Sequence, residues 1–110
     1  VDLTIIIGNL LDNAVEACEK LPSDRRWITV KVIHNTNTSP CSVFLSVENS
    51  SLPVSIVDDH IATTKQEPEL HGFGLHNVME TLHKYDAFHL MSYKNNSFLF
   101  CAEWCEGCAA

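Results

Sequence analysis

Apolar residues recur every three to four positions near the start of the chain and again after its middle. The first set follows the spacing of a helix with one buried face: Leu3, Ile6, Ile7, Leu10, Ala14, Ala17 and Cys18. Asp2 can cap this helix and Pro22 ends it, so we predict a helix over residues 3–20. The second set, which predicts a helix over 72–86, is Leu75, Val78, Met79 and Leu82.

Elsewhere apolar and polar residues alternate, as they do in half-buried strands. Alternation over 27–34 and 41–48, on either side of the turn NTNTSP, predicts an antiparallel hairpin. A second hairpin is predicted from residues 87–93 and 97–104 around the turn KNN. Residues 49–71 show no sustained period and contain two prolines, so we predict a long loop, of the kind that is usually functional in a compact domain.

The order helix, two strands, loop, helix, two strands predicts the fold class. It is typical of an α/β (α+β) two-layer sandwich, with a mixed, mainly antiparallel sheet and both helices on one face. A chain of 110 residues that is 45% hydrophobic can bury one core but not two. We therefore expect one domain over residues 1–104 and a C-terminal tail over 105–110.

Charge and cysteine content narrow the function classes. A net charge of −7 repels phosphate backbones, which argues against general nucleic-acid binding. The chain has no apolar run near the ~20 residues of a membrane span and no basic signal-like segment, so we expect no membrane contact. Five irregularly spaced cysteines favour reduced thiols in the cytoplasm. A zinc or redox site at Cys101, Cys105 and Cys108 is the alternative to free thiols.

Asn9 and Asn13 lie one turn apart on the first predicted helix, although asparagine is a poor helix former. A carboxamide oxygen can coordinate Mg²⁺, and its NH₂ group can donate to a phosphate without the repulsion that a carboxylate would bring. The pair is therefore a candidate metal-phosphate site. The alternative is a pair of buried or capping amides in a helix–helix contact.

A second candidate phosphate site lies just ahead of the second predicted helix. Gly72 and Gly74 allow close approach of the backbone to a ligand, and the helix N-terminus behind them offers free N–H groups. Upstream, Thr63 and Thr64 offer hydroxyls and Lys65 a cation. The alternatives are an ordinary loop-to-helix junction and a solvated loop.

Taken in order, these motifs resemble a known family. The stretches NLLDNAVEA, VENS, TTK, HGFGL and HKYDAFHLMSYKNNSFLF are similar to the ATP-binding domain of the gyrase, Hsp90, histidine kinase and MutL (GHKL) superfamily, over residues 3–104. They are most similar to sensor kinases of the bacterial peptide-pheromone, quorum-sensing type. The resemblance implies a Bergerat-type ATP-binding fold that binds ATP with Mg²⁺.

The resemblance also implies roles for individual residues. Asn13 matches the magnesium-binding asparagine and Asn9 its companion one turn earlier. Asn49 matches the position that accepts a hydrogen bond from the adenine amino group, although most members have aspartate there. Gly72 and Gly74 match the glycines that close over the phosphates, and Thr64 and Lys65 match lid contacts. From their positions alone, Ala17, Ile56 and Leu75 are candidate apolar walls for adenine. Ser51 and Pro53 stand where the family motif has glycines.

Asn9 separates two activities within the superfamily. ATP hydrolysers carry a glutamate there as the base for water, and an amide cannot take that proton. We therefore expect a protein histidine kinase rather than a rapid ATPase, with no catalytic residue in this fragment. The resemblance places the phosphoacceptor on an upstream helical domain, so we expect no autophosphorylation by the fragment alone.

The implied parent is a homodimeric, membrane-bound bacterial sensor of a two-component system, whose cytoplasmic kinase domain serves a response regulator. None of the six histidines lies in the helical setting expected of a phosphoacceptor. Three alternatives stay open. They are a degenerate interaction module that has kept only the fold, an anti-sigma-type serine kinase, and a metal or thiol protein built on the C-terminal cysteines.

Overall fold

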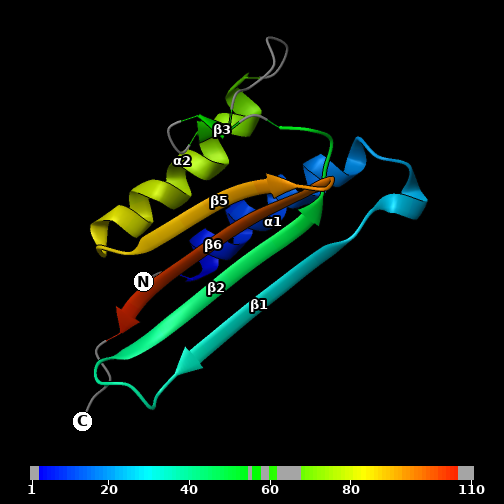
Figure 1. The fold of residues 1–110 in the computed structure, drawn as a ribbon. Helices are drawn as coiled ribbons and strands as arrows, with labels where there is room; N and C mark the ends of the chain where they lie inside the picture. The colour runs from blue at the N-terminus through cyan, green and yellow to red at the C-terminus, as the bar shows by residue number, and fades with distance from the viewer. Residues whose placement is uncertain (1–2, 55, 58–59, 62–67, 107–110) are drawn as a thin grey trace.

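The computed structural model describes residues 3–54, 56–57, 60–61 and 68–106, and for residues 57, 60–61 and 68–74 it describes the backbone alone. The elements follow one another as α1 (Leu3–Glu19), a short 3₁₀ turn η1 (Ser23–Arg25), β1 (Ile28–Asn35), β2 (Cys41–Ser50), β3 (Ile56–Val57), β4 (His60–Ile61), α2 (Pro68–Lys84), β5 (Phe88–Lys94) and β6 (Ser97–Glu106) (Figure 1).

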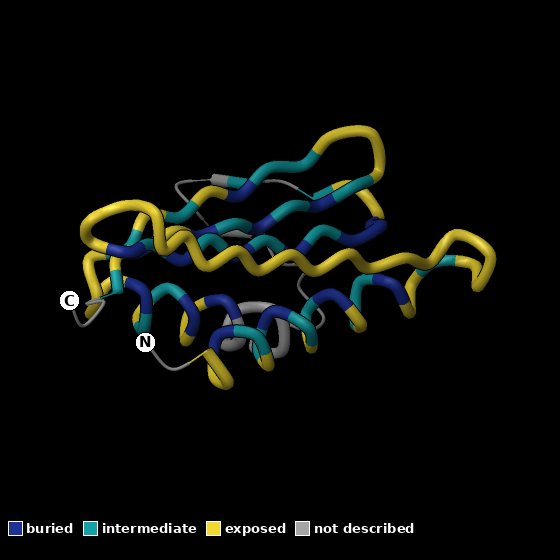
Figure 2. The backbone as a smooth tube through the Cα atoms, turned by 90° about the horizontal axis from the view of Figure 1, so that it is seen from below, coloured by how far each residue is buried: buried dark blue, intermediate teal, exposed yellow. Residues whose placement is uncertain are grey.

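Four strands form one antiparallel sheet in the order β1-β2-β6-β5, and β3 pairs with β4 in a separate two-stranded ribbon. Helices α1 and α2 pack against each other on one face of the large sheet (Figures 1 and 2). The predicted fold class, a two-layer α+β sandwich with helices on one face, is confirmed. Every strand pair among the described residues is antiparallel, so the sheet is less mixed than expected.

The core lies between the two helices and the central strands. Along β2 burial alternates with the strand period, and Val43, Leu45 and Val47 face the helices. On β6 the matching residues are Phe98, Phe100, Ala102 and Trp104, and α1 contributes Ile6, Leu10 and Ala14. Full burial of one such large apolar side chain stabilises the fold by about 1.5–3 kcal/mol. This layer therefore holds α1 against β2.

Two turns bound the elements in the second half of the chain. Helix α2 ends at Lys84, two residues before the predicted end at residue 86. After α2, Asp86 takes a left-handed conformation (φ 56°), and the N–H of Ala87 donates to the carbonyl of Leu82 at 3.0 Å. This is the Schellman arrangement that ends a helix. Between β5 and β6, Asn95 and Asn96 both have positive φ, which is the type I′ turn of a tight hairpin.

The predicted long loop over residues 49–71 is wrong at both ends. Strand β2 continues to Ser50, and α2 begins at Pro68 rather than at residue 72. Proline is well suited to the first position of a helix, where its missing N–H costs nothing. Between these ends, β3 and β4 are two residues each, which is too short to produce a periodic signal in the sequence.

The structure tests the expectation that the cysteines are reduced. Cys18, Cys101 and Cys105 are free thiols, but Cys41 at the start of β2 is disulfide-bonded, so the expectation of reduced cysteines is wrong there. Partial burial raises the pKa of the Cys101 thiol, which keeps it protonated and weakly nucleophilic at neutral pH.

Over the described residues, neither helix is long and apolar enough to cross a membrane.

Candidate functional site

Helix α1 carries a buried apolar stripe and, beside it, a polar stripe. Ile6, Leu10, Ala14 and Cys18 are buried, whereas Asn9 and Asn13 are half-buried on the flank of the helix. The two asparagines are four residues apart, so their side chains stand one above the other on one face. The Nδ2 group of Asn9 donates to the backbone carbonyl of Ile5 at 2.9 Å, which holds that amide along the helix.

The amide of Asn13 is not held in this way. Its Nδ2 atom is buried, and no group among the described residues accepts a hydrogen bond from it. A buried donor without a partner costs about 1–3 kcal/mol, so native proteins rarely keep one without a reason. A bound ligand that accepts this hydrogen bond would remove the cost.

Asn49 lies near the end of β2 on the helix-covered face of the sheet, in register with Ile28 on one side and Phe98 on the other. Its side chain is 3% exposed, and its Nδ2 donates to the backbone carbonyl of Ser50 at 2.9 Å. Within the described residues its carbonyl oxygen makes no hydrogen bond. Asn49 therefore presents an acceptor with its orientation already set.

The chain after Asn49 is tied to the β5–β6 hairpin. The backbone N–H of Ser51 donates to the carbonyl of Asn96 at 3.0 Å, and the Tyr93 hydroxyl donates to the carbonyl of Ser51 at 3.3 Å. The hydroxyl of Ser51 donates to the carbonyl of Leu52 at 2.7 Å. Ser51 is buried, so the position where the resemblance expects a glycine is occupied by an anchored serine.

Helix α2 places the glycine pair differently from the prediction. Because the helix begins at Pro68, Gly72 and Gly74 are its fifth and seventh residues. Only the first four N–H groups of a helix lack intrahelical acceptors. The N–H groups of the two glycines are therefore within the helical ladder in this structure, and the expectation that they precede the helix is wrong.

The other predicted residues are placed as follows. Leu75 is buried in the core beside Val78, and Ile56 packs against the same cluster from β3. Ala17 is half-buried near the end of α1. Thr64 and Lys65 lie outside the described residues. Since α1 and α2 pack against each other, Asn9 and Asn13 share one helical layer with Leu75.

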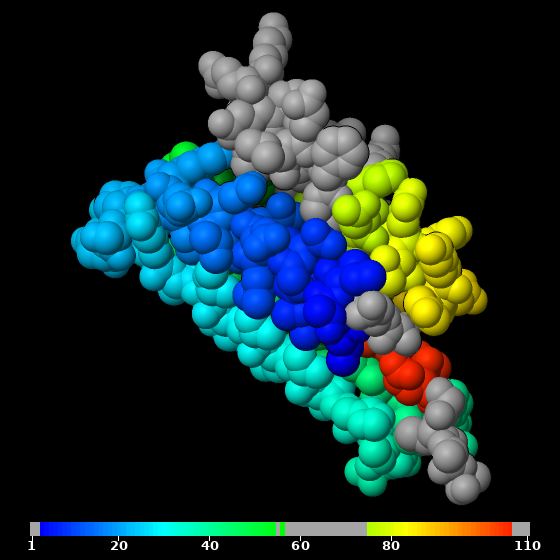
Figure 3. Space-filling view, turned by 180° about the vertical axis from the view of Figure 1, so that it is seen from behind, coloured from blue at the N-terminus to red at the C-terminus, as the bar shows by residue number. Residues whose placement is uncertain are grey.

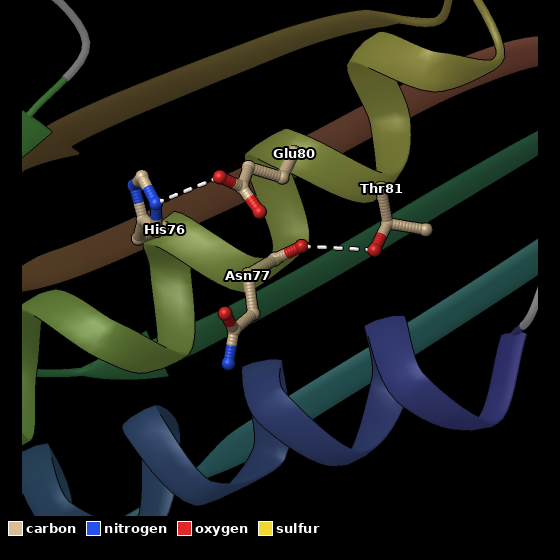
Figure 4. A network of polar contacts seen from close by, with 4 residues as sticks. All are labelled: His76, Asn77, Glu80 and Thr81. Atoms are coloured by element: carbon tan, nitrogen blue, oxygen red, sulfur yellow. Dashed lines mark hydrogen bonds and ion pairs between the residues drawn. The ribbon is translucent and has the colours of Figure 1, made fainter.

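One polar residue on α2 was not singled out from the sequence. Figure 4 shows the carboxamide of Asn77 pointing from α2 toward α1, while its backbone carbonyl accepts a hydrogen bond from the Thr81 hydroxyl at 2.9 Å. On the outer side of the helix, His76 and Glu80 approach to 3.0 Å, and both are largely exposed. Asn77 stands two residues after Leu75, and only that proximity to the predicted motif could have drawn attention to it.

The histidines and the metal-ligand types do not assemble a second site in the described part of the chain. His89 stacks on Phe100, with ring centroids 6.1 Å apart, His76 pairs with Glu80, and His34 and His83 are exposed on a strand and a helix. The described residues contain no group of three or more His, Cys, Asp or Glu side chains that could hold a metal ion.

Comparison with known families agrees with this arrangement of two helices over an antiparallel sheet. The chain matches the model of the GHKL domain family over residues 1–103, and it belongs to that family. GHKL domains bind ATP, generally with Mg²⁺. A search among curated proteins found no match to this chain.

Proposed function

We propose that this chain is the ATP-binding catalytic domain of a sensor histidine kinase of the peptide-pheromone type. In this proposal the domain comprises residues 1–104, followed by a tail over 105–110, and is the cytoplasmic kinase domain of a membrane-bound sensor. The γ-phosphoryl group passes from ATP to a histidine nitrogen on a helical domain of the parent homodimer, ADP leaves, and a response regulator receives the phosphoryl group. Family membership and the pair of asparagines on α1 support the proposal.

The observation that carries the proposal is the amide nitrogen of Asn13, which is buried and has no acceptor among the described residues. A carboxamide on this flank of α1 fits a metal-bound triphosphate, because its oxygen is a suitable Mg²⁺ ligand and its NH₂ group can donate to phosphate oxygen. The bound Mg²⁺ would neutralise charge on the phosphate oxygens. No other described side chain on α1 combines these two capacities with an unmet hydrogen bond.

Each remaining residue has a binding or positioning role in this proposal. Asn49 accepts a hydrogen bond from the adenine amino group through its oxygen, which makes no hydrogen bond within the described residues. Leu75 packs against the adenine ring, and Gly72, Gly74, Thr64 and Lys65 contact the phosphates. Since α2 contains the glycines in this structure, phosphate contact by their N–H groups requires the start of α2 to unwind when ATP binds.

Asn9 explains why the domain would transfer a phosphoryl group instead of hydrolysing ATP. Its amide is bonded to the carbonyl of Ile5 and has no basic nitrogen, so it cannot remove a proton from water. A neutral histidine needs no such activation, because its imidazole nitrogen already carries a lone pair. The domain therefore has only to hold ATP in line with the acceptor and shield it from water.

Calorimetric titration with a Mg²⁺ complex of a non-hydrolysable ATP analogue tests this proposal. We expect binding by the wild-type chain, and at least about tenfold weaker binding by Asn13→Ala, which corresponds to the loss of one charge-assisted contact. Asn37→Ala is the matched control, because Asn37 is an exposed asparagine in the loop between β1 and β2. Equal binding by the wild type and Asn13→Ala would contradict the proposed role of Asn13.

A second candidate function, a degenerate GHKL domain that serves only as an interaction module, is favoured by one observation. Ser51 is buried and bonded where the family motif has a glycine. This candidate predicts that neither the wild type nor Asn13→Ala binds the nucleotide in the titration. An anti-sigma-type serine kinase would instead bind ATP and phosphorylate a serine, so acid-stable phosphate on a partner would distinguish it from the acid-labile phosphohistidine.

A further inference from the structure

Strand β1 is exposed along its whole length, although its sequence alternates like that of a half-buried strand. Ile28, Val30 and Val32 face the same side of the sheet as the buried residues of β2, because Val30 is in register with Val47 and Val32 with Leu45. Yet Val30 and Val32 are 43% and 47% exposed, whereas Leu45 is 0% exposed. In Figure 2 the whole of β1 has the yellow colour of exposed residues.

The reason is the position of β1 at the edge of the sheet. It pairs with β2 on one side, and no described strand pairs with its other side. Helix α1 packs on β2, and in Figure 3 the surface of β1 runs uncovered alongside that of α1. A long edge strand with an unpaired row of N–H and C=O groups is a template for adding another strand.

We propose that β1 pairs antiparallel with β1 of a second copy of this chain, with Val30 at the two-fold axis, so that two four-stranded sheets join into one. Pairing about Val30 sets Ile28 opposite Val32 of the second copy, and Thr29 opposite Lys31. Trp27, which precedes β1, then lies opposite Ile33. This contact lies in the domain itself and is separate from the dimerisation expected of the parent's helical domain.

The choice of the second copy as the occupant rests on self-complementarity in this one register. A two-fold pair that keeps the helices of both copies on one side must be centred on a residue, because a shift by one residue would turn a core-facing row outward. Centring on Lys31 sets two lysines directly opposite each other, which is destabilising. Centring on Val32 sets Val30 opposite His34 and Ile28 opposite Thr36, which leaves the apolar residues unmatched.

The register centred on Val30 also covers the apolar surface that the edge exposes. Its pairs place together five of the large exposed apolar side chains of the molecule: Trp27, Ile28, Val30, Val32 and Ile33. Among the basic residues near the edge, Arg26 is turned toward the end of α1, since its guanidinium donates to the carbonyls of Leu21 at 2.8 Å and Glu19 at 3.2 Å. In this register neither Arg26 nor Lys31 lies opposite the same residue of the second copy.

Sedimentation equilibrium of the full chain over a wide concentration range tests the proposal. We expect the wild type to dimerise, and both Val30→Lys and Val30→Glu to dimerise at least about tenfold more weakly, because each sets like charges opposite each other at the axis. An equimolar mixture of the two variants should recover dimer, since the introduced ammonium of one chain then faces the introduced carboxylate of the other. Val15→Lys, an equally exposed valine on α1, is the control and should dimerise as the wild type does.

Each outcome decides the proposal. A wild-type chain that stays monomeric at every concentration overturns it, and so does a dimer that Val30→Lys leaves intact. A dimer that both variants abolish and their mixture does not restore overturns the register centred on Val30. Circular dichroism shows whether the variants keep the fold, which we expect because Val30 is exposed in the single chain. None of these results depends on ATP binding.

Discussion

Two stripes of side chains on helix α1 differ in how far the rest of the chain meets their needs for apolar contacts and hydrogen bonds. The apolar stripe of α1 is buried against α2 and β2, so its side chains pack against other apolar residues of the chain. The adjacent stripe contains Asn9, whose amide is bonded to its own helix, and Asn13, whose amide nitrogen is buried without an acceptor among the described residues. The first stripe stabilises the fold, and the second contains a hydrogen-bond donor that no described residue uses.

Under the proposed function, this difference implies that stability and ATP binding can be changed separately within one helix. Removing an apolar side chain leaves a cavity whose cost is entirely structural. Removing the Asn13 amide takes away a group that costs the unliganded protein free energy. Substitutions on the two stripes should therefore shift stability in opposite directions.

The largest expected effect is that of Ile6→Ala, because Ile6 is 0% exposed in the core cluster. We expect a loss of about 2–5 kcal/mol in the free energy of unfolding. Urea denaturation followed by circular dichroism measures it. Ile5→Ala is the matched control, since the neighbouring Ile5 side chain is 46% exposed and should cost far less. Similar losses of unfolding free energy in both variants would show that burial does not determine how much each side chain contributes to stability.

Asn9→Glu addresses the polar stripe under the proposed function. The new carboxylate could act as a base toward water, so we expect the rate of ATP hydrolysis to rise at least about tenfold, below the full 10²–10⁴ of an optimised general base. Release of inorganic phosphate measures the rate. The double variant Asn9→Glu with Asn13→Ala should lose the gain, because ATP would no longer be held. An unchanged rate in Asn9→Glu, with ATP still bound, would argue against this role of position 9.

Asn13→Ala should stabilise the protein in the absence of ligand, by about 1 kcal/mol. The substitution removes a buried donor that has no acceptor among the described residues, and alanine is the better helix former. Thermal and urea unfolding of the wild type and the variant, without nucleotide, measure the change. A loss of stability instead would mean that the Asn13 amide supports the fold, and the contrast between the two stripes would fail.

The smallest expected effect lies on the outer face of α2, away from both stripes. His76→Ala removes the pair with Glu80, in which both side chains are more than half exposed. Exposed pairs of this kind contribute at most about 0.5 kcal/mol, so unfolding should be nearly unchanged. A loss above about 1 kcal/mol, measured by urea denaturation in low salt, would show that this face of α2 has a structural role that its exposure does not suggest.

Much of the fold could be predicted from the sequence, because each helix and long strand is set by local periodicity. The four strands of the sheet and the turn at Asn95 and Asn96 lie where alternation and turn residues indicated. Strands β3 and β4 were missed because two residues carry no period. The start of α2 at Pro68 is not predicted, because Gly72 and Gly74 are typical of a loop-to-helix junction four residues later.

The properties that bear on function are non-local and could be predicted less well. The spacing of Asn9 and Asn13 indicated a shared helix face, but only packing against the rest of the chain leaves one amide bonded and the other without an acceptor among the described residues. Alternation in β1 indicated a half-buried strand, yet its exposure depends on which strand occupies the edge. The roles assigned to Asn49, Gly72 and Leu75 stay predictions until ligand binding is measured.

The hydrogen bonds of Ser51 have a mechanical consequence. Both its N–H and its carbonyl are held by the β5–β6 hairpin, through Asn96 and Tyr93. A displacement of the described residues 52–54 therefore leaves Ser51 in place unless one of these two hydrogen bonds breaks. The same two hydrogen bonds fix the backbone two residues after Asn49, which keeps its 3% exposed carboxamide in one orientation at the end of β2.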